Sequence, residues 1–280
     1  MAEISAADVK KLRDATAAGM LDCKNALIEA NGDFEEAQKI LRKKGLAAAG
    51  KRSGRATNEG AIFIANNGKE AIMFEMTCET AFVAQNELFK NSGNKIAKMI
   101  LDGNIGDLNE ASIQEELKAA IAVIKENMLL KRLVRIKGDE NSYIASYQHD
   151  GGSIGALVQL QATSGDTLTK EEVKTFGFEA ALHVAAFNPL YLDVDNVDQK
   201  YKDVQLDVFT TQAKQTGKPD NIIAGIVQGK LTKHYAEVCF LKQAFVKDDK
   251  LSVEKALANV AKANGEFKIT DYKYLKVGQE

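Results

Sequence analysis

The spacing of apolar residues changes along the chain, from a helical period at the start to strict alternation further on. In residues 1–45, three short apolar runs recur at the period of an amphipathic helix. Ser5 and Asp8 have the spacing of a capping box, and Gly45 stands where a left-handed helix end belongs. These signals predict a three-helix module over residues 1–45, with a core too small to be very stable alone.

A segment of small and basic residues follows and predicts a linker over residues 46–58. Arg42, Lys43 and Lys44 stand just before it and add to its positive charge. A nucleic-acid arm is one interpretation, but no aromatic residue is interleaved there to stack on bases. The composition favours a solvated, flexible hinge.

Two stretches of the chain repeat one order, in which alternating strands form a hairpin and a helix follows. The first stretch covers residues 60–101 and the second covers residues 143–186. Helices segregated against antiparallel hairpins are typical of the α+β class. The repeat predicts two related α+β subdomains with antiparallel sheets, one over residues 59–140 and one over residues 141–194 completed by residues 233–280.

Residues 195–232 show a different pattern, which predicts a protruding arm. Val197, Tyr201, Val204 and Val208 step by four, three and four positions, the spacing of a heptad seam. A Gly-Lys-Pro turn interrupts the pattern before helical spacing resumes. Two helices joined by such a turn form an antiparallel hairpin, which either makes a homodimer contact or stands in solvent.

Phe82 occupies a strand-to-helix junction and has two interpretations. An apolar run before it predicts a strand, and Thr80 is a candidate N-cap for a helix over residues 82–101. Phe82, Phe89 and Ile96 recur every seven residues, so on spacing alone the ring belongs to the core. The alternative is a ring that points outward as a wedge for a partner protein.

Composition and charge narrow the class of protein. The chain has 280 residues, a formal net charge of −2 and no apolar run long enough to span a bilayer. Its first residues are acidic and lack the apolar core of a signal peptide. Cys23, Cys78 and Cys239 have no paired spacing, which argues against a disulfide framework or a zinc site. We therefore expect a cytoplasmic protein that is neither in a membrane nor a general nucleic-acid binder.

Motifs of enzyme chemistry are absent from the sequence, including phosphate-binding loops, dinucleotide fingerprints and metalloprotease helices. His183 follows an apolar helix face, so we interpret it as a core residue, whereas His149 falls on an exposed hairpin turn where binding residues are common. Two classes stay open: a regulatory factor that binds another protein, or an enzyme whose carboxylates, such as Glu75 and Glu79, meet only in the fold.

Several segments together resemble the elongation factor Ts family. The most specific is the N-terminal stretch from Val9 to Leu27, continued by Asn31-Gly32-Asp33. Further matching segments are Thr80-Ala81-Phe82-Val83-Ala84, Ser146-Tyr147-Gln148-His149, Ile154-Gly155-Ala156-Leu157-Val158, His183-Val184-Ala185-Ala186, Gly217-Lys218-Pro219 and the run from Gln243 to Asp249. The resemblance extends over essentially the whole chain.

The resemblance implies a translation elongation factor that binds elongation factor Tu with its GDP. Such a factor promotes GDP release by distorting the magnesium and nucleotide site, so that GTP can bind. It has no catalytic chemistry and no cofactor of its own. The implied fold is a ubiquitin-associated-like three-helix module, two related α+β subdomains and a protruding antiparallel helical hairpin. The alternative is an RNA-binding translation factor that uses the basic linker.

The resemblance also implies which residues bind the partner. The family motif Thr-Asp-Phe-Val falls on Thr80, Ala81, Phe82 and Val83, a segment associated with displacing the magnesium ion in Tu. Here Ala81 replaces the family aspartate, so only the apolar part of the motif is retained. With the resemblance added, we interpret Phe82 as the wedge. Further implied partner-binding residues are Leu12, Gly19, Met20, Asp22, Cys23 and His149.

Overall fold

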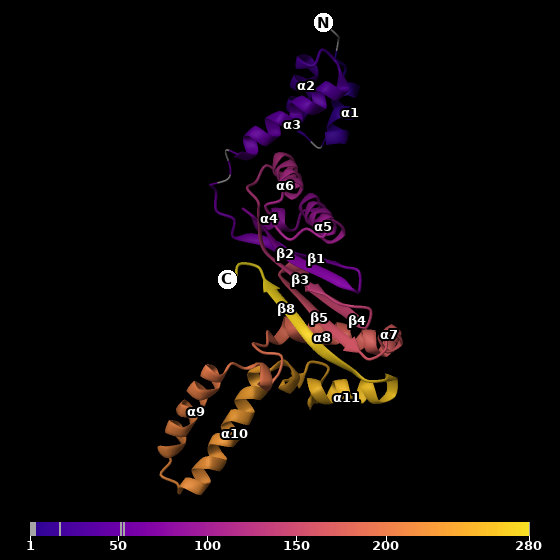
Figure 1. Ribbon diagram of the computed structural model, residues 1–280. Helices are drawn as coiled ribbons and strands as arrows, with labels where there is room; N and C mark the ends of the chain where they lie inside the picture. Colours follow the sequence, from indigo (N-terminus) through magenta and orange to yellow (C-terminus); the bar gives the residue numbers. More distant parts are fainter. Residues whose placement is uncertain (1–3, 17, 51, 53, 280) are drawn as a thin grey trace.

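The computed structural model describes residues 4–16, 18–50, 52 and 54–279. The molecule is elongated, with helices α1 to α3 at one end, the hairpin of α9 and α10 at the other, and two sheets between them (Figure 1). The C-terminus lies beside the sheets in the middle of the molecule. The predicted α+β class, with antiparallel sheets, N-terminal helices and a helical hairpin, is confirmed.

The N-terminal module contains three helices: α1 (Ala6–Thr16), α2 (Met20–Glu29) and α3 (Phe34–Gly50). The predicted capping box is present, because the Ser5 amide donates to Asp8 Oδ2 and the Asp8 amide donates to Ser5 Oγ, both at 3.2 Å. The module encloses its own core of Val9, Leu12, Cys23, Ala26, Leu27 and Ala37.

The predicted end of the third helix at Gly45 is wrong. Helix α3 continues to Gly50, so the predicted linker begins with helical residues. Gly45 instead lies where α3 crosses α6 (Ala111–Ile124), and a Cβ atom there would stand 2.5 Å from the Ala122 Cβ. The glycine therefore serves a close helix crossing, a need that local sequence does not distinguish from a helix end.

Two three-stranded antiparallel sheets form the centre of the molecule. The first has the order β1-β2-β3, with β1 at Glu59–Asn66, β2 at Glu70–Cys78 and β3 at Leu129–Lys137. The second has the order β4-β5-β8, with β4 at Ser142–His149, β5 at Ile154–Ala162 and β8 at Phe267–Lys276. The predicted hairpins are confirmed, and Gly68 takes a φ of +87° in the turn between β1 and β2.

Each sheet packs one face on helices and the other on the second sheet. The layer between the sheets contains Ile62, Ala71, Met73 and Ile136 from the first sheet and Ile144, Leu157 and Leu275 from the second. Helices α5 (Glu87–Asp102) and α6 cover the outer face of the first sheet, and α8 (Glu171–Phe187) and α11 (Val253–Asn264) cover that of the second. Strand β2 is therefore buried on both faces.

The shorter elements connect these layers. Helix α8 begins at Glu171, and Leu168 before it belongs to the separate short helix α7 (Gly165–Thr169). The remaining short elements are α4 (Ala81–Ala84), η1 (Asp150–Gly152), η2 (Val194–Asn196), η3 (Phe240–Lys242), β6 (Ala244–Phe245) and β7 (Asp248–Ser252). Within the described ranges, every helix is too short or too polar to cross a lipid bilayer.

The helical hairpin consists of α9 (Gln199–Lys214) and α10 (Asp220–Val238), but its predicted seam is wrong. Val204 and Val208 are 50% and 40% exposed. The two helices instead pack through a stripe that contains Phe209, Ala213, Ile223, Ile226, Val227 and Leu231. Helix α10 also extends beyond residue 232, the predicted end of the arm, to Val238.

Candidate protein-binding site

Phe82 lies on the outside of the molecule and not in its core. The helix expected over residues 82–101 is two helices, α4 and α5, separated at Gln85 and Asn86. Asn86 caps α5, with its Oδ1 accepting from the Leu88 amide at 2.8 Å. The break removes Phe82 from the register of buried Phe89, and its side chain is 90% exposed. The core interpretation from spacing is therefore wrong.

The short helix α4 is anchored beside its exposed ring. Val83 and Ala84 pack against the core between the first sheet and its helices. Thr80 is the N-cap, as predicted, and its Oγ1 accepts from the Val83 amide at 3.3 Å. Phe82 is thus an apolar side chain held outward by a turn whose last two residues, Val83 and Ala84, pack inward.

Glu126 fixes the backbone just before α4. Its Oε2 accepts from the amides of Glu79 and Thr80 at 3.0 Å and 3.1 Å. Its Oε1 accepts from the Thr80 hydroxyl at 2.7 Å. Three hydrogen bonds to one carboxylate, each strengthened by its charge, hold the segment that leads into Phe82.

A second set of contacts surrounds Glu79 and Cys78. Glu79 Oε1 accepts from the Asn127 amide at 2.6 Å and lies 3.4 Å from the Arg55 guanidinium. The Cys78 thiol donates to the Thr80 carbonyl at 3.3 Å. Burial, followed by the nearby Glu126 charge, raises the pKa of Cys78 to about 12. The thiol therefore keeps its proton at neutral pH and can donate this bond.

The N-terminal module presents a separate apolar surface on α2. Met20, Leu21 and Ile28 are 48%, 70% and 51% exposed. Sequence reasoning selected Met20 but missed Leu21 and Ile28, since an apolar residue on a helix is first assigned to the core. These three side chains form the exposed apolar part of the module.

The other predicted residues of the module have different positions. Leu12 and Cys23 are fully buried in the core of the module, which contradicts their selection as residues that touch a partner. They support the helices that carry the exposed side chains. Gly19 is the N-cap of α2 and has a φ of −64°, so it is not there to supply a left-handed conformation.

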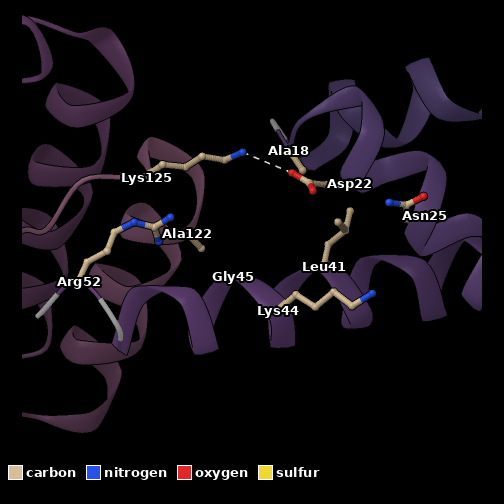
Figure 2. Close-up of a pocket in the computed structure, with 9 residues that line it drawn as sticks. All are labelled: Ala18, Asp22, Asn25, Leu41, Lys44, Gly45, Arg52, Ala122 and Lys125. Carbon is tan, nitrogen blue, oxygen red and sulfur yellow. Dashed lines mark hydrogen bonds and ion pairs between the residues drawn. The ribbon is translucent and has the colours of Figure 1, made fainter.

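Asp22 faces the core across the junction with the module. Figure 2 shows its carboxylate pointing toward the ammonium of Lys125, and the two atoms are 3.3 Å apart. A cavity of about 380 Å³ opens beside this pair, and Arg52 reaches into it from the linker. Lys125 directly precedes Glu126, so the junction and the Phe82 segment meet at one loop.

His149 lies on the second sheet, apart from the α4 segment on the first. It is exposed at the end of β4, as predicted from its hairpin turn. Its Nδ1 is 3.0 Å from the Tyr147 hydroxyl, and Tyr147 packs edge-on against Phe178. This cluster is a second exposed polar and aromatic surface.

The carboxylates proposed for an enzyme are occupied by structural partners. Glu75 is 2% exposed, pairs with Arg132 at 2.8 Å and accepts from the Gly278 amide at 2.8 Å. Glu79 forms an ion pair with Arg55 and accepts a hydrogen bond from the backbone amide of Asn127. Across the part of the chain that the structure describes, no group of three His, Cys, Asp or Glu side chains is placed to hold a metal ion.

Three of the basic residues in and just before the linker pair with carboxylates of the same chain. Three ion pairs join them to carboxylates: Arg42 with Glu115, Lys44 with Glu29, and Arg55 with Glu79. Each pair lowers the positive charge that the linker presents to a polyanion, which argues against the RNA-binding alternative.

Comparisons with known proteins agree with the resemblance found in the sequence. The family model described as Elongation factor TS matches residues 79–279. Elongation factor Ts of Treponema denticola is 45% identical over 263 residues, covering 94% of each chain. Elongation factor Ts of Borreliella burgdorferi strain B31 is 42% identical, covering 99% of this chain and 100% of the relative. The protein of the same name from Borrelia recurrentis is 40% identical, covering 98% and 99%.

Proposed function

Because the chain belongs to the elongation factor Ts family of translation elongation factors, we propose that it binds elongation factor Tu with its GDP and promotes GDP release. Release follows from distortion of the magnesium and nucleotide site of Tu, after which GTP binds. In this role the protein is an exchange factor of the cytoplasm, with no catalytic chemistry and no cofactor of its own.

The single observation that supports this proposal most strongly is the exposure of Phe82 on a fixed turn. Its side chain is 90% exposed, although burying a phenylalanine is worth about 1.5–3 kcal/mol. A ring kept outward at this cost has its favourable environment on another molecule. The anchored residues on either side keep the ring in one place, which a wedge requires.

Exchange needs differential binding and no chemistry. If the chain binds nucleotide-free Tu more tightly than GDP-bound Tu, linkage requires that it weakens GDP by the same factor. Magnesium is a suitable target, since it demands near-ideal octahedral geometry with ligands at about 2.0–2.1 Å. Displacing its protein ligands by a fraction of that length removes much of the metal's contribution to holding GDP.

Phe82 alone is too small to account for the whole effect. A burial of about 1.5–3 kcal/mol corresponds to about one to two decades in affinity. The remaining binding energy comes from a wider interface. We assign it to the apolar surface of α2, formed by Met20, Leu21 and Ile28, and to the second subdomain with His149.

Direct nucleic-acid binding forms no part of this proposal, because Arg55 in the linker and Arg42 just before it pair with carboxylates. A homodimer through the arm stays a prediction, for which exposed Val204 and Val208 on α9 are the candidate contacts. Binding to RNA with a steep loss of affinity as salt rises is the outcome that would favour the alternative function.

The experiment is release of a fluorescent GDP from Tu, followed with and without the chain. We expect the wild-type chain to accelerate release, and Phe82→Ala to lower the maximal rate by about ten- to a hundredfold. Leu206→Ala is the control, since Leu206 is 47% exposed on α9, in the arm at the opposite end of the molecule from the N-terminal module. Equal rates for wild type and Phe82→Ala would overturn the wedge, and no acceleration by wild type would overturn the function.

A further inference from the structure

We infer that Glu126 is the positioning residue for Phe82, and that Lys125 ties this position to the N-terminal module. The inference rests on the proposed function, because it concerns how the wedge is held during exchange. Two neighbouring residues of one loop contact different parts of the molecule. Glu126 binds the segment before α4, and Lys125 binds Asp22 on α2.

The wedge helix has little stability of its own. Helix α4 has four residues, far fewer than an isolated helix needs. Its start is ordered by the Glu126 carboxylate, which accepts from two amides and from the Thr80 hydroxyl. Without that carboxylate the amides of Glu79 and Thr80 are left to water. The bond from the Val83 amide to Thr80 Oγ1 stays, but the backbone that leads into α4 and sets the direction of Phe82 loses its anchor.

The backbone of the loop is held in an uncommon conformation. Lys125 ends α6 with a φ of +67°, a left-handed conformation that side-chain-bearing residues rarely adopt. The αL residue turns the chain sharply between α6 and Glu126. Figure 2 shows the Lys125 side chain extending from this point toward Asp22.

The module contacts the core around a cavity rather than by continuous packing. Helices α3 and α6 meet closely at Gly45 and Ala122, and the cavity of about 380 Å³ separates this crossing from the Asp22–Lys125 pair. Both charged side chains are more than half exposed, so their pairing is weak and adjustable. We infer that a shift of α2 on docking changes this pair and so reaches Lys125 and the adjoining Glu126, with an effect no larger than an exposed ion pair supplies.

A double-mutant cycle on the full chain tests the positioning role of Glu126. We expect Glu126→Ala to lower the maximal rate of fluorescent-GDP release from Tu by about tenfold, with a small change in the half-saturating concentration. In a Phe82→Ala background the same change should have little further effect, because the ring to be positioned is gone. Glu126→Gln should restore most of the rate, since its amide oxygen still accepts from the backbone.

Charge reversal tests the link to the module. Asp22→Lys and Lys125→Asp, each alone, should lower the maximal rate by about two- to fivefold, and the pair together should recover it. Glu87→Ala is the control for loss of a carboxylate near the wedge, since Glu87 pairs with Lys90 on its own helix and not with the segment before α4 in the described part of the chain. Circular dichroism and the melting temperature verify that each variant is folded.

The outcomes separate this inference from the proposed function. If wild type accelerates release and Phe82→Ala does not, but Glu126→Ala matches wild type, the positioning role is overturned and the wedge stands. Full additivity of Glu126→Ala and Phe82→Ala would also overturn it. If the charge-reversed pair recovers nothing, the link through Lys125 is overturned. A wild-type chain without exchange activity overturns the function itself.

Discussion

Phe82 and Phe89 share one residue type, yet the first ring is 90% exposed and the second is fully buried. The difference comes from Asn86, whose side chain caps α5 and ends the preceding turn. Phe82 and Phe89 therefore lie on two separate helices, and the seven-residue spacing does not place their side chains on the same face. At the residue scale, the capping asparagine decides which phenylalanine is available to a partner.

Ala81 is the residue that departs from the family motif, and restoring aspartate there is a direct test. Ala81 is the first residue of α4 and is exposed, so an aspartate side chain fits there and lies at the helix N-terminus, where negative charge is favourable. We expect Ala81→Asp to hold or raise the rate of GDP release from Tu, measured with fluorescent GDP. Ala81→Asn controls for size. A sharp loss with aspartate alone would show that this surface is adapted to an uncharged residue.

His183 makes stability depend on pH. It is fully buried, its Nε2 donates to Gln243 Oε1 at 2.9 Å, and its Nδ1 accepts from the Val246 amide at 3.2 Å. Burial lowers the pKa of His183 below its ordinary 6.5, although the bond to Gln243 opposes the shift. The His183 ring is therefore neutral in the folded protein. Its contribution to the free energy of unfolding is fully present above pH 6.5 and is lost as pH falls through the lower pKa of the folded state.

The prediction from His183 is a fall in the urea midpoint of unfolding between about pH 7 and pH 5. His183→Gln, which cannot gain this charge, should be less stable at pH 7 but should show a flatter midpoint over the same range. If the urea midpoint of His183→Gln falls as steeply with pH as that of the wild type, the pH dependence comes from groups other than His183.

At the scale of elements, Gly45 controls how the module sits on the core. A Cβ atom at Gly45 would lie 2.5 Å from the Ala122 Cβ, so α3 and α6 must separate to accept it. We expect Gly45→Ala to weaken this contact and lower stability by about 1–3 kcal/mol, measured by urea unfolding. Gly225→Ala in α10 is the matched control. It meets open space and should stabilise by about 0.5–1 kcal/mol.

Equal effects of the two glycine substitutions would contradict the role of Gly45 in the helix crossing. A loss at Gly45 with a gain at Gly225 is the result that the packing predicts. The contrast is informative because both residues lie inside helices, so the intrinsic helix preference of alanine is the same at both sites.

Elements with strong local signals were predictable, and errors arose where tertiary packing decides. The hairpin around Gly68, the cap at Thr80 and the core position of His183 follow from residue type and spacing. The arm was predicted as a helical hairpin, but its seam was placed on Val204 and Val208. A lone helix has several apolar rows, and only the partner helix selects the one that is buried.

The candidate site was predictable only in part, for a related reason. The resemblance pointed to Phe82, whereas periodicity assigned the same ring to the core. Leu12 and Cys23 lie in the stretch that resembles the family and are buried in the module, and the resemblance alone does not separate such residues from candidate contact residues such as Met20. Leu21 and Ile28 became candidates only when their exposure was known.

At the scale of the whole molecule, the module and the arm lie at opposite ends of an elongated chain (Figure 1). A partner that contacts both α2 and Phe82 must therefore cover the end of the molecule away from the arm. We expect removal of residues 1–52 to weaken Tu binding at least about tenfold, because the exposed apolar surface of α2 is lost. The measurement is the dissociation constant for nucleotide-free Tu, and an unchanged value would rule out anchoring by the module.

The most direct test of the central claim compares two affinities of one variant. Wild type and Phe82→Ala are titrated against GDP-bound Tu and against nucleotide-free Tu, each by calorimetry. We predict that Phe82→Ala binds nucleotide-free Tu about ten- to a hundredfold more weakly and binds GDP-bound Tu as wild type does. An equal loss of affinity for both forms would show that Phe82 only adds contact area, and would contradict the claim that its ring drives GDP from Tu.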